Sequence, residues 1–222
     1  MRLTCYSPAI PMKNSEIVVK RFLLSLAASL AMAVSAQAGE VSVAVAANFT
    51  APMQKMARLF EQDTGHKATL AFGSTGRFYA QIKNGAPFDL LLSADDETPA
   101  RLAKEGLAVD ASRFTYAIGK LALWSKQPSL VDAQGQVLQS GIFDKIAVAD
   151  PKLAPYGAAA VEVMTQMGVL NTLRPKFVQG DNIAQTHQFV ATQNAQLGFV
   201  ALSQVMADGR LVEGSVWTVP AA

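Results

Sequence analysis

Short apolar runs alternate with helical patterns from residue 40 onward. Residues 41–46 form a predicted strand, and residues 48–52 then supply the capping residue and early proline of a helix start. A second strand is predicted over residues 68–72, and a helix over residues 77–84 follows the turn at residues 73–76. This order of strand, loop and helix favours parallel βαβ units and an α/β fold.

The same alternation continues through the second half of the chain, and we expect the strand that begins at residue 116 to cross into a second lobe. Strands, rather than a flexible tether, would then join the two lobes. The further predicted strands cover residues 90–93, 116–125, 146–149, 177–179 and 197–202, and the further predicted helices cover residues 99–105, 158–167 and 183–192.

A stripe of apolar residues recurs at helical spacing after the first strand. Met53, Met56, Ala57 and Phe60 lie on one face of the predicted helix, which Gly65 would end. We interpret this stripe as core packing rather than as part of a cofactor site.

The first 38 residues have the features of a secretory signal peptide. Lys20 and Arg21 precede an apolar run over residues 22–34, which ends in the small-residue pattern Ala36-Gln37-Ala38. We predict cleavage after Ala38, export to the periplasm, and an upstream extension over residues 1–11. The alternative, an uncleaved membrane anchor, is disfavoured because a membrane span needs about 20 apolar residues.

Composition and charge exclude several function classes. Half of the 222 residues are apolar, 16% are charged, and the formal net charge is +2. Removal of residues 1–38 leaves 15 basic and 16 acidic residues, so the mature chain lacks the basic footprint of a nucleic-acid-binding protein. The single cysteine, Cys5, leaves with the signal peptide, and two histidines are too few for a Cys/His zinc site.

Four predicted strands end in small or polar loops that open a helix. These loops are residues 47–48, 73–76, 155–157 and 181–183. Each helix start offers free backbone N–H groups, which favour anions, and in an α/β sheet such loops meet at the carboxyl ends of the strands. The set of four predicts an anion site in a cleft, although any one loop could serve only as a cap.

Catalytic chemistry has weaker support. The turn Gly73-Ser74-Thr75-Gly76 is not a nucleophile elbow, and it lacks the lysine of a phosphate-binding P-loop. We expect His187 to be a partly buried or surface residue of a helix rather than a base. Asp95 and Asp96 are interpreted as capping or solvated charges.

Five segments together resemble the periplasmic molybdate-binding proteins of ABC transporters. The likeness extends from about residue 41 to residue 220. The segments are VAVAANF at 43–49, FGSTG at 72–76, NGAPFD at 84–89, DPKLAPYG at 150–157 and LGFVALS at 197–203.

The resemblance implies a two-lobed periplasmic binding protein fold of type II. Each lobe would contain a mixed, mostly parallel sheet flanked by helices. We expect residues 39–118 and 204–222 to form lobe 1, and residues 119–203 to form lobe 2.

The family also implies a site for a tetrahedral oxyanion, molybdate or tungstate, held by neutral donors. Asn48 matches a position that donates from its side chain and backbone, and Thr75, with Ser74 beside it, matches a hydroxyl-plus-amide position. Tyr156 and Ile183 match positions that donate backbone N–H groups. No cofactor is implied.

Three positions near these motifs are departures or flanks. Some family members have serine at the position of Asn48 and a ligand-binding tyrosine near Ala201, so this chain is similar to the asparagine-bearing branch. Ala47 offers only its amide where some relatives carry threonine. We expect Arg77 to flank the site without binding the ligand.

The family continues beyond the segment at residues 217–220 with a strand and a helix that pack on the first lobe. From the average lengths of one strand and one helix, we expect about 20 residues to be absent here. Apolar surface and an unpaired sheet edge would then be exposed.

The sequence therefore predicts a monomeric, non-enzymatic receptor that delivers molybdate or tungstate to an ABC transporter permease in the inner membrane. Neutral donors suffice because a hydrogen bond to a charged group contributes about 1.5–3 kcal/mol. Two alternatives remain: a binding protein for sulfate, phosphate or another small anion, and an exported hydrolase that uses Ser74 or Thr75.

Overall fold

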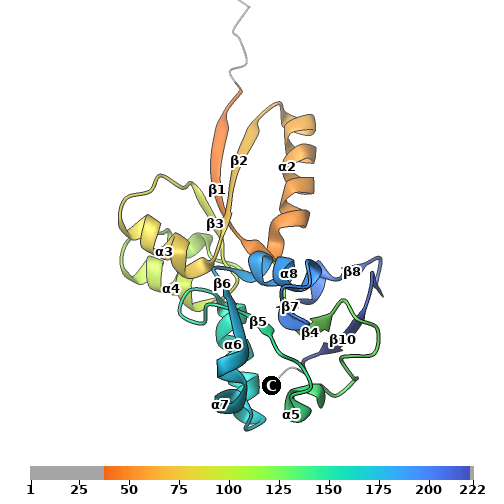
Figure 1. The fold of residues 1–222 in the computed structure, drawn as a ribbon. Helices are drawn as coiled ribbons and strands as arrows, with labels where there is room; N and C mark the ends of the chain where they lie inside the picture. Colours follow the sequence, from red (N-terminus) through yellow and green to blue (C-terminus); the bar gives the residue numbers. More distant parts are fainter. Residues whose placement is uncertain (1–37, 221–222) are drawn as a thin grey trace, which may run out of the picture. The chain divides into compact units, whose positions relative to one another are not determined.

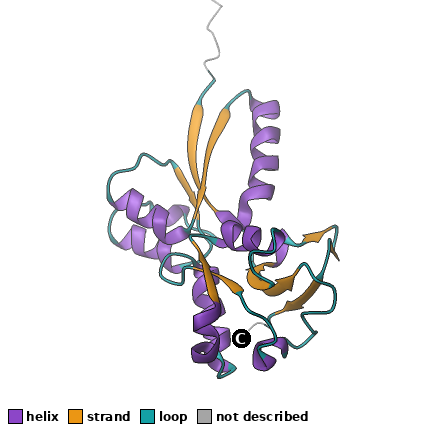
Figure 2. Cartoon of the chain, in the orientation of Figure 1, coloured by secondary structure: helices purple, strands orange, loops and turns teal. Residues whose placement is uncertain are grey.

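The computed structural model describes residues 38–220 (Figures 1 and 2). The predicted signal peptide, its upstream extension and Cys5 lie outside these residues, apart from Ala38, and stay predictions. Between residues 38 and 220, no helix is long and apolar enough to cross a bilayer.

A three-stranded parallel sheet forms from the first part of the described chain. Its strand order is β2-β1-β3, and Val43 of β1 lies between Leu70 of β2 and Leu90 of β3. Helix α2 runs beside β1 and β2 in Figure 1 and packs on both. The elements of this region are β1 (Glu40–Ala46), the 3-10 turn η1 (Ala47–Phe49), α2 (Thr50–Thr64), β2 (Lys67–Gly73), α3 (Thr75–Lys83), β3 (Leu90–Leu92), α4 (Glu97–Lys104) and the 3-10 turn η2 (Asp110–Ser112).

A five-stranded mixed sheet forms from the rest of the chain, in the order β10-β4-β7-β5-β6. Strand β5 is parallel to β6 and β7, whereas β4 is antiparallel to β7 and β10. The elements are β4 (Leu121–Ser125), α5 (Val137–Ser140), β5 (Ile146–Ala149), α6 (Pro155–Gln166), α7 (Leu170–Leu173), η3 (Arg174–Lys176), β6 (Phe177–Gly180), α8 (Ile183–Ala191), β7 (Leu197–Ala201), η4 (Leu202–Gln204), the hairpin strands β8 (Met206–Ala207) and β9 (Arg210–Leu211), and β10 (Ser215–Thr218).

Alternate residues of each strand point to opposite sides of this larger sheet, so both faces are apolar. Helices cover both of them. Leu123 and Phe199 pack with Met164 of α6 on one face. Trp124 and neighbouring side chains pack with Val190 of α8 on the other face. The sheet is therefore the middle layer of an α/β/α arrangement, and the predicted α/β fold class is confirmed.

Two expectations about the chain path are wrong. Residues 116–120 are not part of a strand, since β4 begins only at Leu121. Residues 204–222 were expected in lobe 1, but β10 pairs with β4 of the five-stranded sheet, Trp217 opposite Leu123. Pairing of β10 covers the edge of β4, which would otherwise present unpaired backbone groups. Among the described residues, the chain therefore crosses between the sheets once, over residues 113–120.

The apolar stripe of α2 is buried at one position only. Met53 is 8% exposed and packs against β1, as expected. Met56 and Phe60 are 50% and 38% exposed, so the expectation of core packing is wrong for these two residues.

Candidate functional site

Residues that follow five strands of the two sheets meet around one small cavity. From the three-stranded sheet come the residues that follow β1, β2 and β3, and from the five-stranded sheet come the residues at the starts of α6 and α8. The lining residues are Ala46, Ala47, Asn48, Gly73, Ser74, Thr75, Ala94, Ala154, Pro155, Tyr156, Asn182 and Ile183. The carboxyl ends of strands are where α/β proteins bind ligands.

All five residues that the sequence singled out line this cavity: Asn48, Ser74, Thr75, Tyr156 and Ile183. They come from four loops that lie up to 135 positions apart in the sequence. The cavity volume is about 10 Å³, close to what one water molecule needs. The structure therefore brings the predicted residues together around one small cavity.

Two buried polar atoms of these residues have no hydrogen-bond partner: Asn48 Oδ1 and Ser74 Oγ. Ser74 is the N-cap residue of α3, where a serine hydroxyl usually accepts a bond from the helix, but here it makes no capping bond. Buried polar groups are costly to leave unpaired. A polar ligand in the cavity would supply the missing partner of the Ser74 hydroxyl. The Asn48 amide would meet an anion with Nδ2 after a half-turn of the group.

Thr75 is oriented by a neighbouring backbone group. Its side-chain oxygen accepts a hydrogen bond of 3.0 Å from the N–H of Ala94, and the residue is only 1% exposed. Because that oxygen is already an acceptor, its own hydrogen is free to be donated. The Thr75 hydroxyl is thus available as a hydrogen-bond donor.

The start of α8 leaves one backbone donor for the cavity. The Asn182 side chain accepts from the N–H groups of Ala184 and Gln185, and its carbonyl accepts from Thr186. The N–H of Ile183 lies ahead of these capped groups and has no partner within the helix. Ile183 itself is 4% exposed and lines the cavity.

Tyr156 brings a backbone donor and a buried ring. Pro155 occupies the first turn of α6, where the absence of its N–H costs nothing, and the N–H of Tyr156 is among the groups without an intrahelical partner. Burial raises the pKa of the Tyr156 hydroxyl, while a contact with the Asn48 side chain acts against this rise. The hydroxyl lies against Gly119 of the crossing segment, where a Cβ would collide with it.

The cavity is electrically neutral apart from its dipoles. Tyr156 is the only titratable residue among the lining residues, and its raised pKa keeps it uncharged at neutral pH. Arg77 is not among the lining residues. Its side chain is 61% exposed and lies 4.0 Å from the Asp181 carboxylate. An anion here would be held by hydrogen bonds and helix dipoles.

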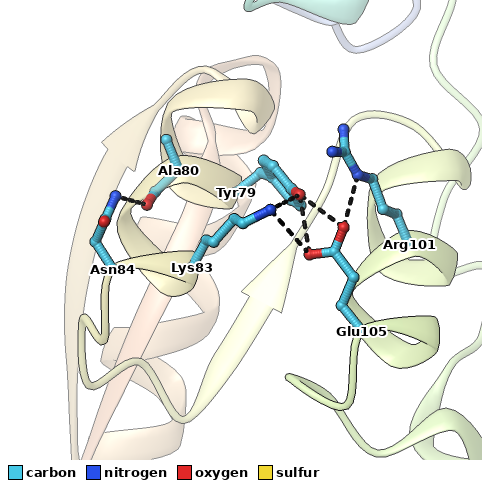
Figure 3. A network of polar contacts seen from close by, with 6 residues as sticks. All are labelled: Tyr79, Ala80, Lys83, Asn84, Arg101 and Glu105. Atoms are coloured by element: carbon cyan, nitrogen blue, oxygen red, sulfur yellow. Dashed lines mark hydrogen bonds and ion pairs between the residues drawn. The ribbon is translucent and has the colours of Figure 1, made fainter.

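Helix α3, which carries Thr75 at its start, is tied to α4 by a network of polar side chains (Figure 3). The Tyr79 hydroxyl donates to Glu105 at 2.9 Å, and Arg101 Nε donates to the same carboxylate at 3.0 Å. Tyr79 and Arg101 lower the pKa of the Glu105 carboxyl. The network holds α3, which supplies Thr75, against α4, which begins three residues after Ala94.

The remaining sequence candidates lie away from the cavity. His187 stacks on Trp124 with ring centroids 5.0 Å apart, and Asp95 accepts from the N–H of Thr98 at the start of α4. Both agree with the packing and capping roles expected of them. Sequence reasoning missed Ala46, Ala94 and Ala154 as lining residues; the strand-to-helix boundary between β3 and α4 is the signal that could have found Ala94. Among residues 38–220, no group of three or more His, Cys, Asp or Glu side chains is placed to hold a metal ion.

Comparison with known proteins agrees with the geometry. The model of the bacterial extracellular solute-binding protein family matches residues 41–222. The chain is 58% identical over 202 residues to the molybdate-binding protein of Azotobacter vinelandii, covering 91% of this chain and 80% of that protein. It is 52% identical over 196 residues to that of Rhodobacter capsulatus, covering 88% and 76%. A solved structure of an Azotobacter vinelandii periplasmic molybdate-binding protein superposes with a TM-score of 0.78 and 43% identity, covering 81% of this chain and 79% of that one.

Proposed function

This chain belongs to the bacterial extracellular solute-binding proteins, and from that premise we propose that it binds molybdate or tungstate in the cavity between its two sheets. Asn48, Ser74, Thr75, Tyr156 and Ile183 would hold the oxyanion. Asn48, Ser74 and Thr75 would donate from side chains, and Tyr156 and Ile183 from the backbone.

The observation that carries the proposal is the convergence of neutral donors from both sheets on one cavity. Each hydrogen bond to a charged group contributes about 1.5–3 kcal/mol, so several such bonds offset the loss of hydration of a dianion. The unpaired Ser74 hydroxyl supports the same assignment, because it needs a partner that the protein does not supply.

Uptake and release would depend on movement between the sheets. A tetrahedral oxyanion is larger than the single water that the present cavity could hold, so the sheets must separate to admit it. The crossing segment at residues 113–120 is the place where a hinge motion would occur. Opening would rehydrate the ion without breaking a buried salt bridge.

Membership of the solute-binding protein family supports a role in a transport system. We propose that it acts in the periplasm after removal of residues 1–38, as a monomer, and that it passes the ion to the permease of an ABC transporter in the inner membrane. It would act by binding alone, because the cavity offers donors but no general base.

A direct test is a thermal-shift and calorimetric comparison of the mature chain with molybdate, tungstate, sulfate and phosphate. Ligand at 100 times its dissociation constant should add about 2.7 kcal/mol of stability. We expect large effects from molybdate and tungstate and weak effects from the other two anions. The absence of any effect from molybdate or tungstate on a folded sample would refute the proposal, and an equal effect from sulfate would assign the site to a smaller anion.

A further inference from the structure

The backbone conformation at position 76 does not require a glycine. Gly76 is the second residue of α3, and its backbone is not in the left-handed region that favours glycine. In a helix, glycine is less stable than alanine because it loses more backbone freedom on folding. A glycine at this position therefore needs an explanation outside the helix.

The explanation lies across the cavity. The N–H of Gly76 donates a hydrogen bond of 2.8 Å to the carbonyl oxygen of Leu153, which belongs to the five-stranded half of the molecule. A Cβ at position 76 would lie 2.9 Å from that oxygen and 3.0 Å from the Leu153 Cα. Both atoms are backbone atoms and cannot turn aside, so only glycine permits this approach.

The contact joins two of the loops that line the cavity. Gly76 directly follows Thr75, and Leu153 lies three residues before Tyr156. The Gly76 N–H is also one of the donors that a helix leaves without an internal partner. The bond to Leu153 satisfies it only while the two halves stay together.

Besides the contact of Tyr156 with the Asn48 side chain, two other polar contacts between the halves are longer than the Gly76 bond. Arg77 lies 4.0 Å from Asp181, and both side chains are more than half exposed, so water and salt screen the pair. The Ser203 hydroxyl donates to the Asn48 carbonyl at 3.3 Å. The backbone contact at Gly76 is the shortest of the three and the one that a single methyl group would block.

We propose that Gly76 is a closure residue: the absence of its side chain lets the two halves meet at Leu153, and this approach sets how tightly the closed form holds its ligand. The inference rests on the proposed function. Gly76 acts through the position of the two loops and does not itself bind the ion.

The proposal predicts opposite effects of one substitution on folding and on binding. In Gly76→Ala, α3 gains a better helix former, so the unliganded chain keeps or raises its melting temperature. In the closed form the new methyl group would collide with the Leu153 backbone, so the population of the closed form falls. The apparent dissociation constant rises as the reciprocal of the closed fraction, so a fall to a tenth gives about a tenfold loss of affinity.

The experiment compares Gly76→Ala and the bulkier Gly76→Leu with Arg77→Ala, a matched control on the same helical turn. Molybdate affinity is measured by calorimetry, the melting temperature is measured without ligand, and the radius of gyration is measured by X-ray scattering with and without molybdate. We expect affinity to fall at least tenfold in Gly76→Ala and further in Gly76→Leu. The melting temperature of Gly76→Ala should be maintained, and Arg77→Ala should change affinity less than about threefold.

Unchanged affinity in Gly76→Ala would overturn the inference, and so would a lowered melting temperature, which would indicate a purely structural role. Failure of the wild-type chain to bind molybdate would refute the proposed function instead. The closure inference is then decided by scattering without ligand: a larger radius of gyration in both Gly76 variants than in the wild-type chain supports it, and an equal radius refutes it.

Discussion

The five-stranded and the three-stranded sheet bury their apolar side chains to very different degrees. In the larger sheet, Leu123 and Phe199 are completely buried. In the smaller sheet, Phe72 is 37% exposed and Leu90 is 49% exposed. Met56 of helix α2, which packs on the smaller sheet, is likewise 50% exposed.

The difference shows what an apolar pattern can and cannot predict. The periodicity of residues 50–64 predicts a helix, and the helix forms. Burial of its apolar face needs further elements on that side, and only Met53 obtains such cover within residues 38–220. In the larger sheet, α6 and α8 cover opposite faces, so all four residues of β5 are buried.

The largest effect should separate two phenylalanines, one from each sheet. Phe199→Ala removes a fully buried ring from the larger sheet, and we expect a loss of about 3–5 kcal/mol in the free energy of unfolding. Phe72→Ala, the matched change in the smaller sheet, should cost clearly less because that ring is already partly in water. Urea denaturation measures both, and equal losses would contradict the contrast between the sheets.

The two sheets should also differ in how they contribute to binding. Asn48→Ala removes a side-chain donor of the smaller sheet, and we expect an affinity loss of about 1.5–3 kcal/mol, roughly tenfold to a hundredfold. Ile183→Val keeps the backbone N–H that the larger sheet supplies and should leave affinity nearly unchanged. Calorimetry with molybdate measures both variants, and an unchanged affinity in Asn48→Ala would mean that the ion is held elsewhere.

Acidic pH should weaken the well-buried half of the molecule. Burial lowers the pKa of His187, which stacks on Trp124, and the charge of Glu213 partly opposes this shift. The unfolded chain binds the proton more readily, so stability is complete above about pH 6.5 and falls as the pH drops toward the lowered folded value. Melting curves between about pH 7.5 and pH 5 should show a smaller loss for His187→Gln than for the wild-type chain. Equal losses would exclude His187 as a source of the pH dependence.

The smallest effect on stability is expected on the exposed face of α2. Met56→Gln and Leu59→Gln replace side chains that are 50% and 48% exposed, so the free energy of unfolding should change by less than about 0.5 kcal/mol. The same variants should bind less of a hydrophobic dye and associate less in sedimentation runs. A large loss of stability would show that this face is packed in solution.

The sequence predicted the order of elements well because strands, loops and helices leave local signals. Residues 146–149 were predicted as a strand and are β5. Pairing was harder to predict: β10 lies beside β4, almost 100 residues earlier in the chain, and no local signal at residues 215–218 identifies that partner. Residues 116–120 have the composition of a strand but no neighbouring strand to bond with.

The candidate site was predictable for a similar reason. Its donors stand at helix starts, and a helix start is recognisable from residues such as Pro155 and Asn182. The approach of Gly76 to Leu153 was not predictable, because it depends on how two distant loops meet in space. The unpaired state of the buried Ser74 hydroxyl was not predictable either, because burial depends on packing in three dimensions.

The cap that Asn182 places on α8 has an evolutionary consequence. The Asn182 side chain accepts from residues 184 and 185 and leaves the main-chain amide of residue 183 uncapped. In the proposed site this amide makes the contact, so the residue at that position is free to drift among apolar types without erasing it. Selection would act instead on Asn182 itself, whose loss would let the amide turn elsewhere. A receptor built in this way can accumulate substitutions around its ligand and still present the same pattern of donors.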